Sequence, residues 1–205
     1  MKHMEIEYKW DANVPRAFIR ATQAVQELCG KVVAKHLFIT DTYLDDANNH
    51  LAKQLVALRV RNIGAIWEAT FKTRSAVKQG KATRREETLA LPSVKNLSQA
   101  LKKLAQQKTW KDICTTNLHV RFSLKNKRTV YEFTYQHTQM EMALDRVTLY
   151  VAGRRVTMQE IELELKKGTE KKFDEFAQFF AQKTNLSQAK ISKVKTAEAL
   201  LNLWK

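Results

Sequence analysis

Charged and apolar side chains alternate along several segments of this chain, and this alternation limits the folds that it can adopt. Between residues 5 and 10, the sequence Glu-Ile-Glu-Tyr-Lys-Trp places a charged side chain at every second position. Residues 160–165, Glu-Ile-Glu-Leu-Glu-Leu, have the same pattern. Because successive side chains of a strand point to opposite faces, each segment predicts a strand with one charged face and one apolar face.

The same pattern, together with runs of β-branched and aromatic residues, predicts strands along most of the chain. Helical segments interrupt these strands without following each of them, which favours an antiparallel α+β arrangement over a parallel sheet. The predicted strands are His3–Trp10, Val32–Tyr43, Leu55–Asn62, Ala65–Arg74, Ala82–Leu91, Asn117–Leu124, Arg128–Tyr135, Gln139–Arg146 and Val156–Lys166.

Boundary residues predict a first helix over Val14–Cys29. Asn13 is the expected N-cap, Pro15 lies in the first turn and Gly30 follows the last residue. The residues expected on its core face are Phe18, Ala21, Val25 and Leu28. Further predictions are helices over Ser98–Gln107 and Glu170–Lys183, shorter helical pieces between Asn185 and Trp204, and a flexible loop over Ser75–Lys81.

The charged strand faces do not suit an outer surface. Like charges at neighbouring positions repel, and residues 160–165 carry three glutamates on one face. A closed sheet can turn such a face inward and pack its apolar face against helices, so we predict a closed antiparallel barrel of about eight strands, a tunnel with a charged lumen and helices outside. Unpaired charges there would cost several kcal/mol each, which calls for a metal ion and a polyphosphate. The other alternating charges are Arg59 and Arg61, Lys72 and Arg74, Arg84 and Glu86, and Glu141 and Asp145.

The net charge also indicates an anionic ligand. The chain has 36 Lys and Arg against 21 Asp and Glu, a formal charge of +15. The basic residues are spread along the sequence instead of clustering with aromatic residues, so nucleic acid is not the expected partner. The sequence has no GKS/T and no GxSxG, which leaves a P-loop enzyme and a serine hydrolase without support.

Other features are those of a protein of the cytoplasm. The chain has no apolar run of about eighteen residues and no signal-peptide pattern, so neither a membrane segment nor export is expected. Cys29 and Cys114 have no partners at metal-ligand spacing and are expected to be buried apolar residues, not a disulfide or a zinc site.

Short charged motifs recur along the chain in a definite order. The first is Glu5-Ile6-Glu7-Tyr8-Lys9, with the pattern ExExK. The motifs that follow it are Thr40-Asp41-Thr42-Tyr43-Leu44, Leu58-Arg59-Val60-Arg61, Thr70-Phe71-Lys72, Arg84-Arg85-Glu86, Ala143-Leu144-Asp145, Glu160-Ile161-Glu162-Leu163-Glu164-Leu165 and Ser192-Lys193. In this order the chain resembles the CYTH domains, also called triphosphate tunnel metalloenzymes, whose signature is ExExK, and the resemblance spans nearly the whole chain.

The resemblance implies a single domain over residues 1–205, with C-terminal helices over 169–205 packed on the barrel. It implies that Mg²⁺ or Mn²⁺ binds to carboxylates and that Arg and Lys hold phosphate. The metal candidates are Glu5, Glu7, Asp145, Glu160, Glu162 and Glu164, and the pair of closing-strand glutamates that faces the metal is left open. The phosphate-binding candidates are Lys9, Arg59, Arg61, Lys72, Arg84, Arg128 and Lys193, where Arg128 is favoured over Lys125 and Lys127. The residues expected to take part in catalysis are Glu5, Glu7, Lys9, Arg59, Arg61 and Lys72.

The activity implied is metal-dependent hydrolysis of a small-molecule triphosphate, with inorganic tripolyphosphate, split to pyrophosphate and phosphate, as the preferred substrate. Thiamine triphosphate hydrolysis and class IV adenylate cyclase activity are alternatives within the same family. A module that binds polyphosphate or RNA without catalysis is an alternative of another class. No membrane partner is expected, and the oligomeric state is left open, with a dimer as one alternative.

Overall fold

The computed structural model of the chain describes residues 2–73, 75–78, 80–107, 110 and 117–204. Its strands are β1 (Lys2–Asp11), β2 (Ala34–Asp45), β3 (Ala57–Ile63), β4 (Ile66–Lys72), β5 (Ala76–Lys78), β6 (Lys81–Ala90), β7 (His119–Tyr135), β8 (Thr138–Val151) and β9 (Arg154–Lys167). Its helices are α1 (Ala17–Cys29), α2 (His50–Lys53), α3 (Leu97–Ala105), α4 (Glu170–Thr184) and α5 (Lys193–Leu203).

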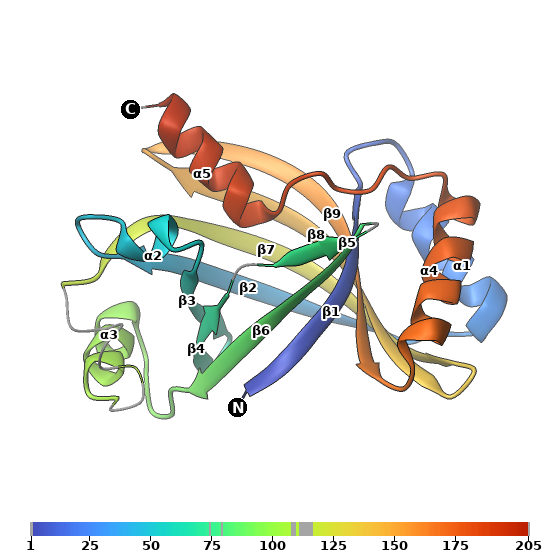
Figure 1. The fold of residues 1–205 in the computed structure, drawn as a ribbon, viewed down its shortest axis with the longest axis horizontal. Coiled ribbons are helices and arrows are strands. Elements are labelled where there is room, and N and C mark those ends of the chain that lie inside the picture. Colours follow the sequence, from blue (N-terminus) through green and yellow to red (C-terminus); the bar gives the residue numbers. More distant parts are fainter. Residues whose placement is uncertain (1, 74, 79, 108–109, 111–116, 205) are drawn as a thin grey trace.

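The strands form one antiparallel sheet in the order β1-β9-β8-β7-β2-β3-β4-β6-β5 (Figure 1). Strand β1 pairs with β9 along one edge and with β6 along the other, and this second pairing closes the sheet. The described strands therefore make a closed barrel of eight, and the short β5 pairs with β6. The predicted α+β fold with a closed antiparallel barrel is confirmed.

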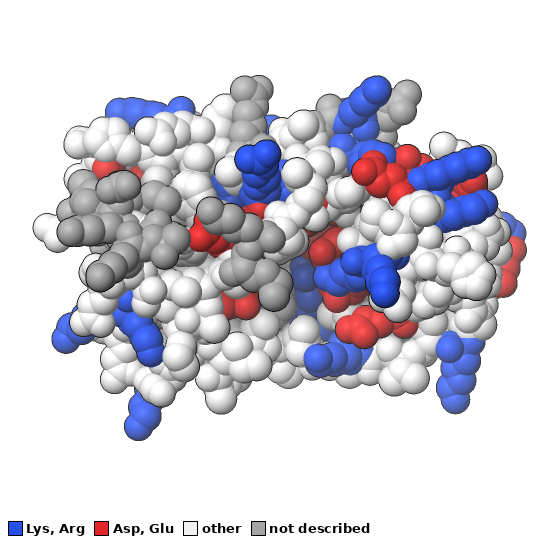
Figure 2. Space-filling model, turned by 60° about the horizontal axis from the view of Figure 1, so that its bottom comes forward, with Lys and Arg blue, Asp and Glu red and all other residues white. Residues whose placement is uncertain are grey.

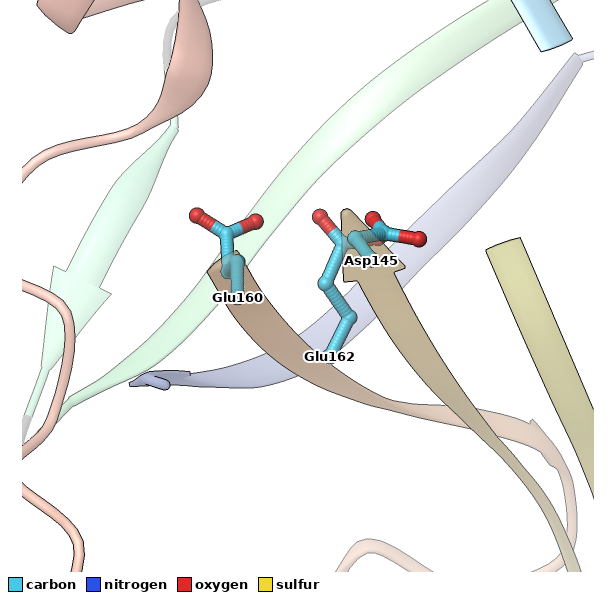
Figure 3. Close-up of side chains that lie close together, drawn as sticks. All are labelled: Asp145, Glu160 and Glu162. Atoms are coloured by element: carbon cyan, nitrogen blue, oxygen red, sulfur yellow. The ribbon is translucent and has the colours of Figure 1, made fainter. Parts of the chain in front are cut away.

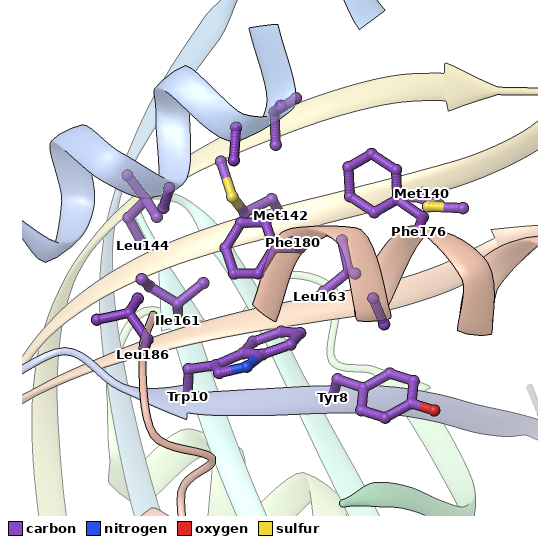
Figure 4. Packing of buried hydrophobic residues seen from close by; sticks show 14 of the residues in the cluster. Tyr8, Trp10, Met140, Met142, Leu144, Ile161, Leu163, Phe176, Phe180 and Leu186 are labelled. Atoms are coloured by element: carbon purple, nitrogen blue, oxygen red, sulfur yellow. The ribbon is translucent and has the colours of Figure 1, made fainter. Parts of the chain in front are cut away.

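Helices α1 and α4 cover the outer face of the long strands at one end of the molecule (Figure 1). The apolar half of each alternating pattern is buried there, as Trp10 and Ile161 have no exposed surface. The Trp10 ring lies 4.6 Å from the ring of Phe180 on α4, and the side chains of β1, β8 and β9 fill the space between sheet and helices (Figure 4). This core holds the strands with their charged faces on the inside.

Two other helices cover the barrel elsewhere. Helix α3 packs through Ala100 and Leu104 against the apolar residues of β3 and β4. Helix α5 packs through Ala197 against a cluster that contains Tyr43 and Leu124, which also line the cavity of the barrel. Helix α5 therefore lies over inward-facing residues at one end of the tunnel, in contrast to α1 and α4, which cover the outer face.

The first helix begins later than the sequence predicted. It starts at Ala17 after Arg16, and Asn13 is not its N-cap. The Asn13 side chain instead accepts a hydrogen bond from the Gln159 backbone N–H at 2.8 Å, so a contact with β9 replaces the local cap. Leu28 was predicted on the core face but is 38% exposed, because the buried face runs through Ala17, Ala21, Ala24 and Val25.

Two strand predictions also change. The predicted strands Asn117–Leu124 and Arg128–Tyr135 are parts of one strand, β7, because the ladders with β2 and β8 continue across the residues between them. The predicted flexible loop Ser75–Lys81 contains β5, which pairs with β6. Arg74 and Cys114 lie outside the described residues, and Cys29 is a half-buried free cysteine. None of the described helices is long and apolar enough to cross a membrane.

Candidate functional site

The charged faces of the strands meet inside the barrel around a cavity of about 260 Å³. Each strand contributes through the register of its ladder. Arg59 lies opposite Tyr43 on one side and Thr70 on the other, and Thr70 lies opposite Thr88. Basic and acidic side chains also lie next to each other on the face seen in Figure 2, several of the acidic ones in a hollow. The candidate residues that line the cavity are Glu5, Lys9, Arg59, Arg61, Lys72, Arg84, Arg128, Glu162, Glu164 and Lys193.

Three carboxylates from two neighbouring strands form a compact acidic cluster, which consists of Asp145, Glu160 and Glu162. One oxygen from each lies within 4.8 Å of the others. Asp145 on β8 lies directly opposite Glu160 on β9, and Glu162 follows two residues later on the same face. The three side chains point to the same side of the two strands (Figure 3).

Three basic side chains surround the acidic cluster. Lys193 Nζ lies 2.9 Å from Asp145 Oδ2 and 2.8 Å from Glu162 Oε1, and it also contacts Glu160. Arg128 donates two hydrogen bonds to Asp145, at 2.7 and 2.6 Å, and another to Glu162. Lys9 contacts Glu162 and lies 2.9 Å from Glu7 Oε2.

The surroundings set different pKa values for the three carboxylates. Burial raises the pKa of Glu160, against the opposing effect of Lys193 and Lys9. Burial would also raise the pKa values of Glu162 and Asp145. Lys193 and Arg128 together outweigh this effect and lower the pKa of both carboxylates. At neutral pH Asp145 and Glu162 therefore offer ionised carboxylate oxygens.

A second group of carboxylates lies where β1 meets β6. Arg84 pairs with Glu5 and with Glu7, and Lys72 pairs with Glu86. Burial raises the pKa of Glu5 to about 7, against the opposing effect of Lys72. Burial would also raise the pKa of Glu86, but Lys72 and Arg84 hold it well below its usual value. Glu5 and Glu7 thus lie in this second group instead of in the acidic cluster, and Lys9 links the groups by contacting Glu7 and Glu162.

The two arginines of β3 differ in how firmly they are held. Arg61 donates two hydrogen bonds of 2.7 Å to Asp41. Arg59 donates one to Thr70 Oγ1 at 3.1 Å, and its nearest contact with Asp41 is 3.9 Å. Burial would raise the pKa of Asp41, but Arg61 and Arg59 outweigh it and lower the pKa to about 2. The Arg59 guanidinium is therefore the more available of the two for a phosphate.

The structure distinguishes between alternatives that the sequence left open. Glu164 lies apart from the acidic cluster and pairs with Lys166 at 3.0 Å, opposite Glu141 in the ladder. Arg128 lines the cavity, whereas Lys125 and Lys127 lie on the outer face of β7 and are exposed.

Sequence reasoning did not select Asp41 and Glu86 as site residues, although both are buried in the lumen and hold basic candidates in position. Glu86 has the same parity as Arg84 on its strand, and this parity could have identified it, because an inward carboxylate needs a basic partner across the ladder. Asp41 shares its side of β2 with Ile39 and Tyr43, so no charged strand face marked it.

The acidic cluster fits a hard divalent cation. Mg²⁺ and Mn²⁺ prefer oxygen ligands, and the three carboxylates supply oxygens that lie within 4.8 Å of one another. The buried Glu160 Oε2 has no hydrogen-bond partner among the described residues, which is the condition of an oxygen able to accept another ligand.

Comparisons with known proteins place this chain in a family. An inorganic triphosphatase from Haemophilus influenzae is 26% identical over 180 residues, which cover 83% of this chain and 51% of that protein. The chain therefore spans about half the length of this relative.

Two solved structures share the fold. One, from Hippeastrum, is described as an adenylyl cyclase that reveals a dominant triphosphatase activity, with a TM-score of 0.70, 19% identity and coverage of 98% of this chain and 96% of the other. The second is described as an adenylate cyclase from Bacillus halodurans, with a TM-score of 0.65, 21% identity and coverage of 95% and 97%. The model of the CYTH domain matches residues 3–197, which is nearly all of the barrel and its helices, and the chain therefore belongs to the CYTH domain family.

Proposed function

We propose that this protein hydrolyses a small-molecule triphosphate with the help of Mg²⁺ or Mn²⁺, and that inorganic tripolyphosphate is its preferred substrate. The observation that carries the proposal is the lining of one cavity by the basic residues Arg59, Lys72 and Arg84 beside an acidic cluster suited to a metal ion. The name of the relative from Haemophilus influenzae and the triphosphatase activity described for the Hippeastrum protein support it.

Tripolyphosphate suits this cavity because its recognition needs charge more than shape. Guanidinium groups bind phosphate oxygens with two parallel hydrogen bonds, and an ammonium group acts as a point charge. Arg59, Arg61, Lys72 and Arg84 would bind the phosphate chain from the side of β3, β4 and β6. Lys9, Arg128 and Lys193 would bind it from the side of the acidic cluster.

The metal ion would be held by Asp145, Glu160 and Glu162. Glu5 and Glu7, which belong to β1, would lie near the bound phosphates. A divalent cation in such a site neutralises phosphate charge and activates or orients water. In the reaction, a water oxygen bonds to the terminal phosphorus as the bond to the bridging oxygen breaks, which gives phosphate and pyrophosphate. Arg59, Lys72 and Arg84 would stabilise the negative charge that moves to the leaving pyrophosphate.

A phosphate-release assay with tripolyphosphate, ATP and thiamine triphosphate, each with Mg²⁺, Mn²⁺ or EDTA, tests the proposal. We expect the fastest release from tripolyphosphate and none with EDTA. Faster phosphate release from thiamine triphosphate would identify that compound as the preferred substrate. Formation of cyclic AMP from ATP would show that the protein is a cyclase. If tripolyphosphate bound but was not hydrolysed under any of the metal conditions, the protein would be a non-catalytic binding module.

A further inference from the structure

A second charged surface lies outside the barrel, on the face of β2, β7, β8 and β9 that the helices leave open. Its groove of about 540 Å³ is defined here by Phe38, Lys125, Lys127, Arg146 and Tyr150 and is called the outer groove. A neighbouring groove of about 380 Å³ lies against α1 and shares Arg146. Together they form a long surface along the outside of the sheet.

The outer groove is separate from the tunnel because neighbouring side chains of β7 alternate between them. Lys125 and Lys127 line the groove, whereas Arg128 lines the cavity inside the barrel. Asn126 lies between the two lysines, is buried in the barrel wall and borders both spaces. A ligand in the outer groove therefore does not need the residues proposed for hydrolysis.

The charge of the outer groove has one sign. Phe38, Lys127 and Arg146 lie opposite one another on three adjacent strands, and Lys125 lies in the next row of the ladder. No Asp or Glu of the described ranges lines this groove or its neighbour. Three basic side chains on adjacent strands without carboxylates form a surface for an extended anion.

Aromatic rings accompany these basic groups. The Phe38 side chain is 72% exposed, and Tyr150 is 38% exposed. Lys125 Nζ lies 5.8 Å from the centre of the Tyr150 ring, and the Arg146 guanidinium lies 4.7 Å from that of Phe18 on α1. An exposed aromatic ring beside a basic group offers a nucleobase a stacking surface next to a contact for its phosphate.

We infer that the outer groove binds single-stranded nucleic acid, with bases stacked on Phe38 and Tyr150 and phosphates at Lys125, Lys127 and Arg146. A linear polyphosphate would use the basic residues and leave the rings without a role. A second copy of this chain would present the same positive surface, and the net charge of +15 opposes that contact. The inference is independent of the proposed triphosphatase activity.

Binding of labelled oligo(U) and oligo(dT) of about twelve nucleotides, followed by fluorescence anisotropy at several salt concentrations, tests the inference. Each phosphate contact with a single strand contributes about −0.7 to the slope of log K against log salt, so three contacts predict a slope of about −2. The double variant Lys125→Ala/Lys127→Ala should reduce the magnitude of the slope by about 1.4, from about −2 to about −0.7. Phe38→Ala should weaken binding about tenfold with an unchanged slope, because it removes stacking without removing charge.

The matched control is Lys53→Ala/Lys171→Ala, which removes two exposed lysines outside both grooves and should leave the slope unchanged. These three variants remove exposed side chains, and their melting temperatures and phosphate release should match those of the parent protein. Equal loss in the control would mean non-specific attraction and would overturn the inference. The inference would also be overturned if no oligonucleotide bound, or if only Arg59→Ala, in the tunnel, abolished binding. It would be overturned as well if polyphosphate displaced the oligonucleotide and Phe38→Ala had no effect on binding.

Discussion

Lys193 Nζ lies 2.9 Å from Asp145 Oδ2 and contacts Glu160 and Glu162 as well, so one ammonium group pairs with all three carboxylates of the acidic cluster. Lys193 is the first residue of α5, and Ser192 caps that helix by accepting a hydrogen bond from the Lys195 backbone N–H. A metal ion that binds the same three carboxylates must take the place of this ammonium group. Metal binding and the position of Lys193 are therefore coupled.

The variant Lys193→Ala tests this coupling. Without metal, the three carboxylates lose a shared partner and repel one another, so the melting temperature should fall by several degrees. Mn²⁺ no longer competes with the ammonium group, so it should raise the melting temperature of the variant by more than that of the parent protein. Thermal unfolding with Mn²⁺ and with EDTA measures both effects.

Lys195→Ala is the matched control, because Lys195 is an exposed basic residue on the same helix. It should respond to Mn²⁺ as the parent protein does. An equal response to Mn²⁺ in Lys193→Ala and the parent protein would show that the lysine and the metal do not share the carboxylates.

The inner face could be predicted because it depends on parity, which is a local property of each strand. Alternation brought Glu5, Lys9 and Arg59 to the same side without any knowledge of the fold. Which of Glu160 and Glu164 lies beside Asp145 could not be predicted, because it depends on which residue of β8 lies opposite each of them. That register is set by ladders between distant segments.

The missing carboxylates and the changed boundaries have the same cause. Asp41 was not selected because its partner Arg61 belongs to another strand. Asn13 is a residue type that often caps helices, yet its side chain accepts a hydrogen bond from the backbone of Gln159 on β9. In both cases a contact with a distant strand, which the local sequence does not show, determines the position of the side chain.

Glu162→Gln and Glu164→Gln form a pair that identifies the metal ligands. Both remove one negative charge from the same face of β9, but only Glu162 belongs to the acidic cluster. Metal-dependent phosphate release should fall by more than about a hundredfold in Glu162→Gln, since a lost ligand costs several kcal/mol of transition-state stabilisation. Glu164→Gln should retain activity within about tenfold of the parent protein. The reverse order of activities would indicate that the metal binds near Glu164 and Glu141 instead of at the acidic cluster.

Arg59→Ala and Arg61→Ala should separate substrate binding from stability. Arg59 makes looser contacts, and its Nε has no hydrogen-bond partner among the residues described, so its loss should raise KM for tripolyphosphate about tenfold or more with little change in melting temperature. Arg61→Ala leaves the buried Asp41 without its two hydrogen bonds, so its melting temperature should fall further. Steady-state kinetics and thermal unfolding of both variants decide this. A larger fall in melting temperature for Arg59→Ala would make it the structural arginine.

The low pKa of Asp41 predicts how stability changes in acid. Burial would raise that pKa, but Arg61 and Arg59 lower it to about 2, whereas an unfolded aspartate has a pKa of about 3.9. Between these values the unfolded chain binds more protons than the folded one, so the contribution of Asp41, about 2 to 3 kcal/mol, is full above about pH 5 and lost as pH falls through 2. About half should be lost by pH 3.

Urea unfolding of the parent protein and of Asp41→Asn between pH 5 and pH 3 measures this loss. The difference in unfolding free energy between them should shrink by about 1 kcal/mol over that range, because only the parent protein has the ionised group to lose. Gln23→Ala, which removes an exposed side chain that does not titrate, serves as the control and should keep a constant difference. A constant difference for Asp41→Asn as well would mean that Arg61 does not hold the Asp41 pKa low in the folded protein.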